Sequence, residues 1–396
     1  MTSEIGSEDR KYRESRAFDT SVPYSVGCAS VCESNRKPPL AFPDFLIIGA
    51  QKAGTSWLAS NLSCHPNVWM PPLKELHYFD ERIKELPYGA SLARLSTKRY
   101  TELDWYPWYW RYQLRYLLER RFRRYEKNFD SETFLWTLKF FGRPPSDKWY
   151  ASLFEQGRAK TTGEATPDYS ILEEESVARI HGLMPSAKVI FFMRNPVERP
   201  YSSAVMQLRN LRGMGREMEA AALQPFFESF SRQPTVVSHT RYLQSLEKWR
   251  RFYPDDQIFV GFLEDIHFYP VGLLQRLYRF LGLDPSQAQE VKKRKINPGL
   301  QEHMPAQLAA QLARTYYKDL KRLSACFGGY ACFWLYCAEK LIRGTLGEDE
   351  IPYPLWDSWL WEEWRGRPHS SMPPHTRDGG VVQSGSLTEL SKVDSA

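Results

Sequence analysis

The chain has 396 residues, of which 42% are hydrophobic and 25% are charged, and its formal net charge is +6. This size and composition are typical of a globular protein with one large domain or two ordinary ones. The charge favours an anionic ligand or surface but is too small for a protein that coats nucleic acid, so we expect no nucleic-acid partner. The six cysteines include no CxxC pair and are too few for a disulfide framework, so we expect reduced thiols and no metal site.

The first 40 residues are polar, contain Pro38 and Pro39, and show no hydrophobic periodicity, which predicts a flexible lead-in. The opening sequence MTSEIGSEDRKYRESR lacks the apolar core of a signal peptide or membrane anchor. From this we expect a cytoplasmic protein.

After the lead-in, predicted strands alternate with predicted helices. The apolar runs that are typical of buried strands in a parallel sheet are residues 42–49, 188–193 and 257–262. The predicted helices are residues 56–63, a segment from about residue 196, and residues 241–252 and 271–281. This alternation predicts an α/β domain over residues 41–345, with a mainly parallel central sheet that helices flank on both faces.

Two segments depart from this alternation. Residues 81–149 resemble an insertion rich in Arg, Tyr and Trp, and residues 346–396 combine a Trp-rich extension with a tail predicted to be disordered. Within the insertion, residues 111–125 predict a helix with a basic and an apolar face. The solvated face of a core-packed helix is the commoner interpretation, and peripheral membrane contact or binding of an anionic acceptor is the alternative. Residues 331–338 are apolar but too short to span a bilayer, and predict a buried helix.

Residues 49–56 (GAQKAGTS) lie between a predicted strand and a predicted helix. Glycines permit a tight turn with converging N–H groups, and the helix N-terminus adds partial positive charge, so the segment is typical of a phosphate-binding loop. It differs from GxxxxGK[ST], because the lysine falls inside the loop at Lys52 and Thr55 takes its place. A lysine inside the loop suits a 5′-phosphate with its sulfate. A strand-to-helix turn with a solvated lysine is the alternative.

Four segments together resemble the sulfotransferase superfamily that uses 3′-phosphoadenosine-5′-phosphosulfate (PAPS), and its heparan-sulfate-type branch in particular. They are FLIIGAQKAGTSWL at 45–58, KELHYFD at 74–80, GEATPDY at 163–169 and KVIFFMRNPVERPYSS at 188–203. The resemblance implies a P-loop-like three-layer fold. It also implies that the first segment binds the 5′-phosphosulfate through Lys52, Ala53, Gly54, Thr55, Ser56 and Trp57.

The fourth segment is expected to bind the 3′-phosphate of the donor. Arg194 can hold a phosphate through two parallel hydrogen bonds, and the resemblance assigns Arg194 and Ser202 to that group. The alternative is an Arg194 that only forms an ion pair with Glu198. Further contacts with the donor are predicted for Tyr242, which opens a helix, and for Arg294 and Lys295, which lie in the basic run 292–295.

Three residues are candidates for the chemistry of transfer. Lys52 is expected to neutralise charge on the leaving nucleotide, and Glu75 matches the general base of the branch. His77 is the rival base, and a histidine that only supports the site is the favoured interpretation of it. At Ala165 the heparan-type enzymes typically have Lys, so the sequence departs from the family there.

These features predict transfer of a sulfuryl group from PAPS to a hydroxyl or amine of a carbohydrate, lipid-linked or small-molecule acceptor, by in-line displacement. One alternative is a P-loop nucleotide kinase. It is disfavoured by Thr55 and by the lack of a convincing acidic residue that closes a buried strand to hold Mg²⁺. The other alternative is an inactive binding module of the same fold.

Overall fold

The computed structural model describes residues 40–80, 131–213, 217–289, 291, 303–344 and 350–367. Some of the sequence predictions concern segments outside these residues. They are the lead-in, residues 81–130 of the insertion with its basic helix, the loop with Arg294 and Lys295, and the C-terminal tail.

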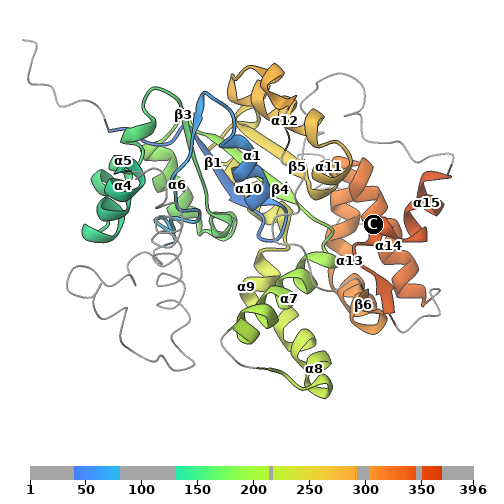
Figure 1. The fold of residues 1–396 in the computed structure, drawn as a ribbon. Coiled ribbons are helices and arrows are strands. Elements are labelled where there is room, and N and C mark those ends of the chain that lie inside the picture. The colour runs from blue at the N-terminus through green and yellow to red at the C-terminus, as the bar shows by residue number, and fades with distance from the viewer. Residues whose placement is uncertain are drawn as a thin grey trace, which may run out of the picture. The chain divides into compact units, whose positions relative to one another are not determined.

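The centre of the fold is a five-stranded sheet in the order β2-β3-β1-β4-β5 (Figure 1). Its strands are β1 (Phe45–Gly49), β2 (Val68–Trp69), β3 (Thr161–Ala165), β4 (Lys188–Met193) and β5 (Ile258–Phe262). Each neighbouring pair of these strands runs parallel. The predicted α/β fold with a mainly parallel sheet is therefore confirmed.

The two central strands, β1 and β4, are apolar apart from Lys188 because both of their faces are covered. All five residues of β1 are buried, and β4 is buried after Lys188. The ring of Phe45 fits beside Gly163 on β3, where a Cβ atom would lie 2.2 Å from the ring. A glycine at this position lets a large aromatic ring fill the contact between neighbouring strands.

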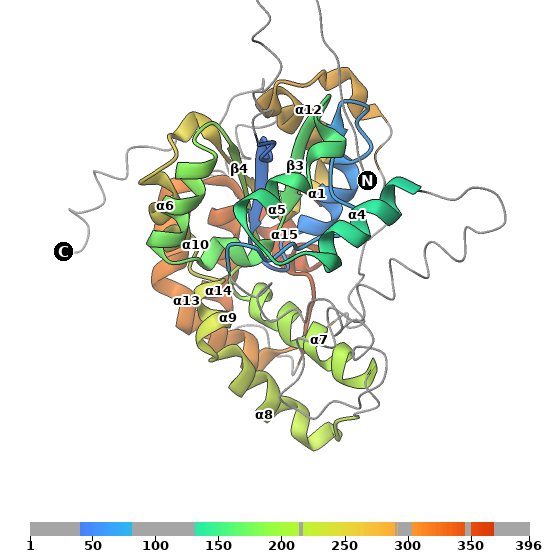
Figure 2. The same ribbon diagram turned by 90° about the vertical axis from the view of Figure 1, so that its left-hand side faces the viewer.

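Helices cover the sheet on both faces, as Figure 2 shows. One face carries α1 (Thr55–Leu62) and α12 (Pro270–Leu281), and the other carries α6 (Glu174–Leu183) and α10 (Tyr242–Arg250). This arrangement follows from right-handed crossovers that leave β1 and β3 in opposite directions across the sheet. The predicted three-layer fold is confirmed.

The order of the strands also indicates the edge of the sheet at which a ligand is expected to bind. From β1 the chain crosses to β2 and returns to β3 on one side, and it then crosses to β4 on the other side of β1. Where the connections from neighbouring strands run in opposite directions, they create a switch point at the carboxyl ends of those strands. Open α/β sheets bind ligands at such a point. The loop after β1 and the segments after β3 and β4 meet at this edge.

The remaining elements flank this core. Those near the first edge strand are α4 (Ser131–Gly142) and α5 (Asp147–Ser152). Those between β4 and α12 are α7 (Glu198–Gly213), α8 (Ala220–Ser231), α9 (Pro234–Ser238) and α11 (Leu263–Phe268). Those of the C-terminal part are β6 (His303–Pro305), α13 (Ala306–Phe327), α14 (Gly329–Arg343), β7 (Glu350–Pro352) and α15 (Trp359–Arg365).

The C-terminal part packs against the end of the sheet. On α14, the ring of Trp334 lies 5.5 Å from that of Phe262 at the end of β5, and β6 pairs with β7 in antiparallel fashion. The predicted buried helix over residues 331–338 is confirmed as part of α14. Among the described residues, no helix has both the length and the apolar character needed to cross a membrane. The domain boundary expected near residue 345 stays a prediction.

Candidate functional site

The loop after β1 turns sharply into α1, as the sequence predicted. Gly54 has a φ of 93°, and a Cβ atom there would lie 2.4 Å from Cδ1 of Ile266, so only glycine fits. The first-turn N–H groups of α1 have no acceptor within the helix and carry its partial positive charge. The side chains of Ala53, Thr55 and Trp57 are buried, and that of Ser56 is partly exposed.

Lys52 places its side-chain ammonium group, a cation, in this loop. Burial, together with the nearby charges of Arg194 and Arg209, lowers the pKa of Lys52 to about 8. Among the described residues no carboxylate lies within 4 Å of its ammonium group, although Glu75 is near enough to raise its pKa slightly. Within the described part of the chain this cation is partly buried and has no paired carboxylate, an arrangement that suits an anionic ligand.

Arg194 follows β4 directly, and its guanidinium contacts Glu198 and Ser202 on α7 and the carbonyl of Lys52 in the loop after β1. Its Nε and Nη2 atoms each lie 3.1 Å from Oε2 of Glu198. Its Nη1 atom donates to Ser202 Oγ at 3.1 Å and to the carbonyl of Lys52 at 3.3 Å. The ion pair with Glu198 is therefore present, and it orients a guanidinium that also joins Ser202 to the loop. The assignment of Arg194 to the 3′-phosphate stays a prediction.

Tyr242 lies behind this arginine. Its side chain is buried, and its hydroxyl donates to the carbonyl of Arg194 at 2.7 Å. This contact fixes the backbone at the end of β4. Arg199 is also buried and donates to Thr240 Oγ1 and to the carbonyl of Val236, both at 2.7 Å, so it ties α7 to α9.

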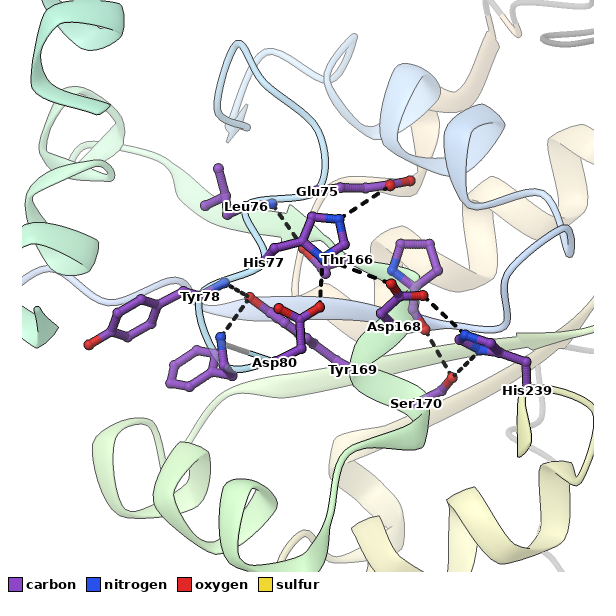
Figure 3. A network of polar contacts seen from close by, with 12 residues as sticks. Glu75, Leu76, His77, Tyr78, Asp80, Thr166, Asp168, Tyr169, Ser170 and His239 are labelled. Atoms are coloured by element: carbon purple, nitrogen blue, oxygen red, sulfur yellow. Dashed lines mark hydrogen bonds and ion pairs between the residues drawn. The ribbon is translucent and has the colours of Figure 1, made fainter. Parts of the chain in front are cut away.

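Glu75 lies at the same edge, and its backbone N–H donates to the carbonyl of Ala165 at the end of β3. Its carboxylate is 30% exposed, and its Oε1 atom lies 2.5 Å from Nζ of Lys74. Its Oε2 atom lies 3.7 Å from Nε2 of His77 (Figure 3). Burial acts to raise the pKa of Glu75, but Lys74 and His77 outweigh it and lower the pKa to about 2. Glu75 is thus an ionised carboxylate that solvent can reach.

His77 is surrounded by carboxylates. Its Nδ1 atom lies 2.6 Å from Asp80 Oδ2 and 3.9 Å from Asp168 Oδ2. Burial acts to lower the pKa of His77, but Asp80, Glu75 and Asp168 raise it to about 10. At neutral pH the ring is therefore a cation. Asp168 continues the network to His239, whose Nε2 lies 3.1 Å from Asp168 Oδ1 (Figure 3).

Side chains of His77, Asp80 and Asp168 also place ligand atoms within 4.8 Å of one another, a spacing that a metal ion could use. The same atoms already form hydrogen bonds and ion pairs with one another. The geometry is explained by those contacts, and acidic groups commonly gather in this way without a metal.

A second buried network holds the segment that carries Glu75. Thr166 Oγ1 donates to Glu164 Oε2 at 2.8 Å and accepts from the N–H of Leu76 at 3.1 Å. Tyr150 donates to the other oxygen of Glu164. Burial raises the pKa of Glu164 to about 7. Glu164 therefore lies beneath the site and supports it, and Thr166 joins the segments that follow β2 and β3.

Backbone conformation singles out the three residues predicted to be catalytic. Among the described residues, the non-glycine residues with positive φ are Lys52 at 71°, Glu75 at 68° and His77 at 53°. Such conformations cost about 1–3 kcal/mol each and concentrate at functional sites. The coincidence is an observation independent of the sequence motifs.

Three members of this site were absent from the sequence prediction. Asp80 stands three residues after His77, and this short spacing within one segment could have indicated that the two side chains interact. His239 and Tyr353 approach the site from distant parts of the chain, and neither has a local signal. Tyr353 accepts a hydrogen bond from Arg194 Nη2 at 2.7 Å.

Comparison with known proteins gives a family and several relatives. A model described as "Sulfotransferase family" matches residues 43–287. Heparan sulfate glucosamine 3-O-sulfotransferase 6 of Mus musculus is 30% identical over 136 residues, which are 34% of this chain and 39% of that protein. The bifunctional heparan sulfate N-deacetylase/N-sulfotransferase of Drosophila melanogaster is 24% identical over 256 residues, which are 62% of this chain and 20% of that protein.

The match thus spans well under half the length of these curated relatives, whose names belong to the heparan-sulfate-type branch. A sulfotransferase structure from Alicyclobacillus acidocaldarius is 24% identical, with a TM-score of 0.46, over 72% of this chain and 95% of that chain. Because the family model covers more than half of the residues, including the loop after β1 and Arg194, the chain belongs to the sulfotransferase family.

Proposed function

We propose that this protein transfers a sulfuryl group from PAPS to a hydroxyl or amine of an acceptor. The observation that carries the proposal is the hydrogen bond from Arg194 to the carbonyl of Lys52, at 3.3 Å. It joins the candidate 3′-phosphate site to the candidate phosphosulfate loop, so one nucleotide with anionic groups at both ends can contact both. Family membership supports the same reaction.

The residues at this edge fit such a donor. Lys52, the first turn of α1, Arg194 and Ser202 supply cationic and hydrogen-bond-donating groups, which suit phosphate and sulfate oxygens. No carboxylate of the described residues lies within 4 Å of the Lys52 ammonium, so it is available to an anion. Lys52, Ala53, Gly54, Thr55, Ser56 and Trp57 would hold the 5′ end, and Arg194 and Ser202 the 3′-phosphate, with Tyr242 fixing the Arg194 backbone.

The bound donor supplies a sulfuryl group on a good leaving group, so the protein's own work is positioning and charge stabilisation. Glu75 is ionised and solvent-accessible, and it takes the proton of the acceptor hydroxyl or amine. Lys52 stabilises the negative charge that develops on the departing oxygen. His77, as a cation, has no lone pair for a proton and instead orients Glu75.

The chemical class of the acceptor is inferred from the names of the similar proteins. Their names specify heparan sulfate, and on that basis we infer a carbohydrate, with lipid-linked and small-molecule acceptors retained as the other classes. The cytoplasmic location and peripheral membrane contact expected from the sequence stay predictions.

A nucleotide kinase is not favoured. An acidic residue, Glu264, does follow the buried strand β5, but its Oε1 accepts from Trp334 Nε1 at 2.6 Å. Burial raises the pKa of Glu264 to about 8, so it is mainly neutral and poorly suited to Mg²⁺. The matching family is one of sulfotransferases, which agrees with this conclusion.

Thermal shift with 3′-phosphoadenosine-5′-phosphate (PAP), beside ATP with Mg²⁺, tests the proposal. Ligand at about 100 times its dissociation constant adds roughly 2.7 kcal/mol, which raises Tm by several degrees. We expect stabilisation by PAP that is lost in Arg194→Ala and kept in Arg212→Ala, a change of the same kind at an exposed position near the end of α7. Stabilisation by Mg-ATP alone would overturn the proposal. Turnover with radiolabelled PAPS then separates an enzyme from an inactive binding module.

A further inference from the structure

Tyr353 lies against the candidate 3′-phosphate site although it is far outside the residues matched by the family model, which end at 287. Its hydroxyl accepts from Arg194 Nη2 at 2.7 Å, and its ring lies 5.1 Å below the guanidinium carbon of Arg194. It is also a hydrogen-bond neighbour of Ser202. Three groups that bind oxygen atoms of a phosphate well therefore converge at the start of α7.

The segment around Tyr353 is anchored at this position by further contacts. The N–H of Leu355 donates to Glu198 Oε1 at 2.6 Å, on the carboxylate that also pairs with Arg194. The ring of Tyr201 stands edge-on to that of Tyr353 at 5.1 Å. Upstream, β7 pairs with β6. The hydroxyl of Tyr353 thus has a fixed place beside Arg194.

The chemistry of the group suits a ligand contact. Burial raises the pKa of Tyr353, so the phenol stays neutral and keeps its proton. A neutral hydroxyl can accept from Arg194 while it donates to an oxygen of an anion. Arg194 already has Glu198 as its charge partner, so Tyr353 is not needed to neutralise it.

We propose that Tyr353 is a donor-binding residue, which adds its hydroxyl to Arg194 and Ser202 in holding a phosphate monoester. This inference rests on the proposed function and deepens it. The segment that contains β7 and Tyr353 is then part of the nucleotide site. Binding of the nucleotide should therefore also order this segment.

The test compares two ligands on the purified 396-residue chain by calorimetry. PAP carries the 3′-phosphate and 5′-AMP lacks it, so the ratio of their dissociation constants reports the contacts to that phosphate. Tyr353→Phe removes one hydroxyl and keeps the ring. Tyr330→Phe is the matched control, because the hydroxyl of Tyr330 has no hydrogen-bond partner among the described residues.

We expect Tyr353→Phe to weaken PAP binding about 10- to 100-fold, the usual effect of losing a hydrogen bond to a charged group. Binding of 5′-AMP should change little, and Tyr330→Phe should leave both unchanged. Equal weakening of both ligands would mean a merely structural role, and tighter PAP binding would mean that Tyr353 competes with the phosphate. Either result overturns the inference.

A second measurement covers the case of a variant that folds poorly. In the unmodified protein, PAP should slow amide hydrogen exchange in residues 350–358, because the phosphate adds a partner to Tyr353. Unchanged exchange in this segment, with PAP bound, overturns the inference while the proposed function stands. Failure of the unmodified protein to bind PAP at all would instead refute the proposed function.

Discussion

The Nε2 atom of His77 lies 3.7 Å from Oε2 of Glu75, and its Nδ1 atom lies 2.6 Å from Asp80. The imidazole thus stands between the accessible carboxylate of Glu75 and the less exposed carboxylate of Asp80. Its pKa of about 10 makes it a cation, and the pKa of about 2 for Glu75 makes that residue an anion. The two candidates for the general base therefore have different charges, and only Glu75 can accept a proton at neutral pH.

Replacement of Glu75 by Gln should lower kcat about 10²- to 10⁴-fold, since a positioned base typically contributes that factor. PAP should bind nearly as well as before, because the change is isosteric. The measurement is turnover beside PAP affinity, with Glu155→Gln as a control at a surface ion pair with Lys139. Normal turnover in Glu75→Gln would remove it from the role of base.

The rate should depend on the protonation of Lys52. Its pKa of about 8 means that the cation is lost above that pH, so kcat/KM should fall as pH rises through about 8. Lys52→Arg should be slower but should lose this alkaline limb, because arginine keeps its charge. If the fall in kcat/KM at alkaline pH persists unchanged in Lys52→Arg, a group other than Lys52 causes it.

His77 should stabilise the fold in a pH-dependent way. Its pKa is raised from 6.5 to about 10 in the folded protein, so its stabilisation is fully present below pH 6.5 and is lost as pH rises toward 10. The difference in unfolding free energy between the unmodified protein and His77→Asn should therefore shrink over this range, by an amount on the order of a few kcal/mol.

Asn is chosen because it tolerates the left-handed conformation that His77 adopts. Urea denaturation at pH 6 and pH 10 provides the measurement. His181→Asn on α6 serves as the matched substitution control. A constant difference for His77→Asn would show that the ring is not a buried cation.

Gly54→Ala should destabilise the protein by about 1–3 kcal/mol, because alanine disfavours a φ of 93° and its Cβ would meet Ile266. At Gly182 in α6 an added methyl group would have no neighbouring atom within 4 Å, so Gly182→Ala should instead stabilise slightly. Thermal denaturation of the two variants compares them directly. An unchanged Tm for Gly54→Ala would mean that the loop relaxes without cost.

PAP binding should survive removal of divalent metal. Asp80 and Asp168 already pair with His77, which supplies the positive charge that they need. Calorimetry after dialysis against EDTA should give the same dissociation constant. A loss that Zn²⁺ or Mg²⁺ restores would assign a metal to the group of His77, Asp80 and Asp168.

The sequence predicted those parts of the site that are formed by residues close to one another in the chain. The run KVIFFM predicted β4 with its bounds, since a strand buried on both faces reads as a nearly continuous apolar run. The loop with Lys52 and Gly54 was also predictable, because glycines and a strand-to-helix change mark it. Glu75 and Arg194 were reached through the family resemblance.

Pairings between distant segments could not be read in this way. His239 reaches Asp168 and Tyr353 reaches Arg194 only because the sheet order and the β6–β7 pairing bring them together. The charge of His77 depends on three carboxylates at fixed distances, which no linear pattern specifies. Arg294 and Lys295 lie outside the described residues, and their role stays a prediction.

The contacts of residues 353–355 have a practical consequence for the design of expression fragments. A fragment cut where the family match ends, at residue 287, would lack the partners that Arg194 and Glu198 find in Tyr353 and Leu355. It would also expose Phe262, whose ring packs against Trp334. Fragments for crystallisation or activity assays should therefore extend through α15, to at least residue 367.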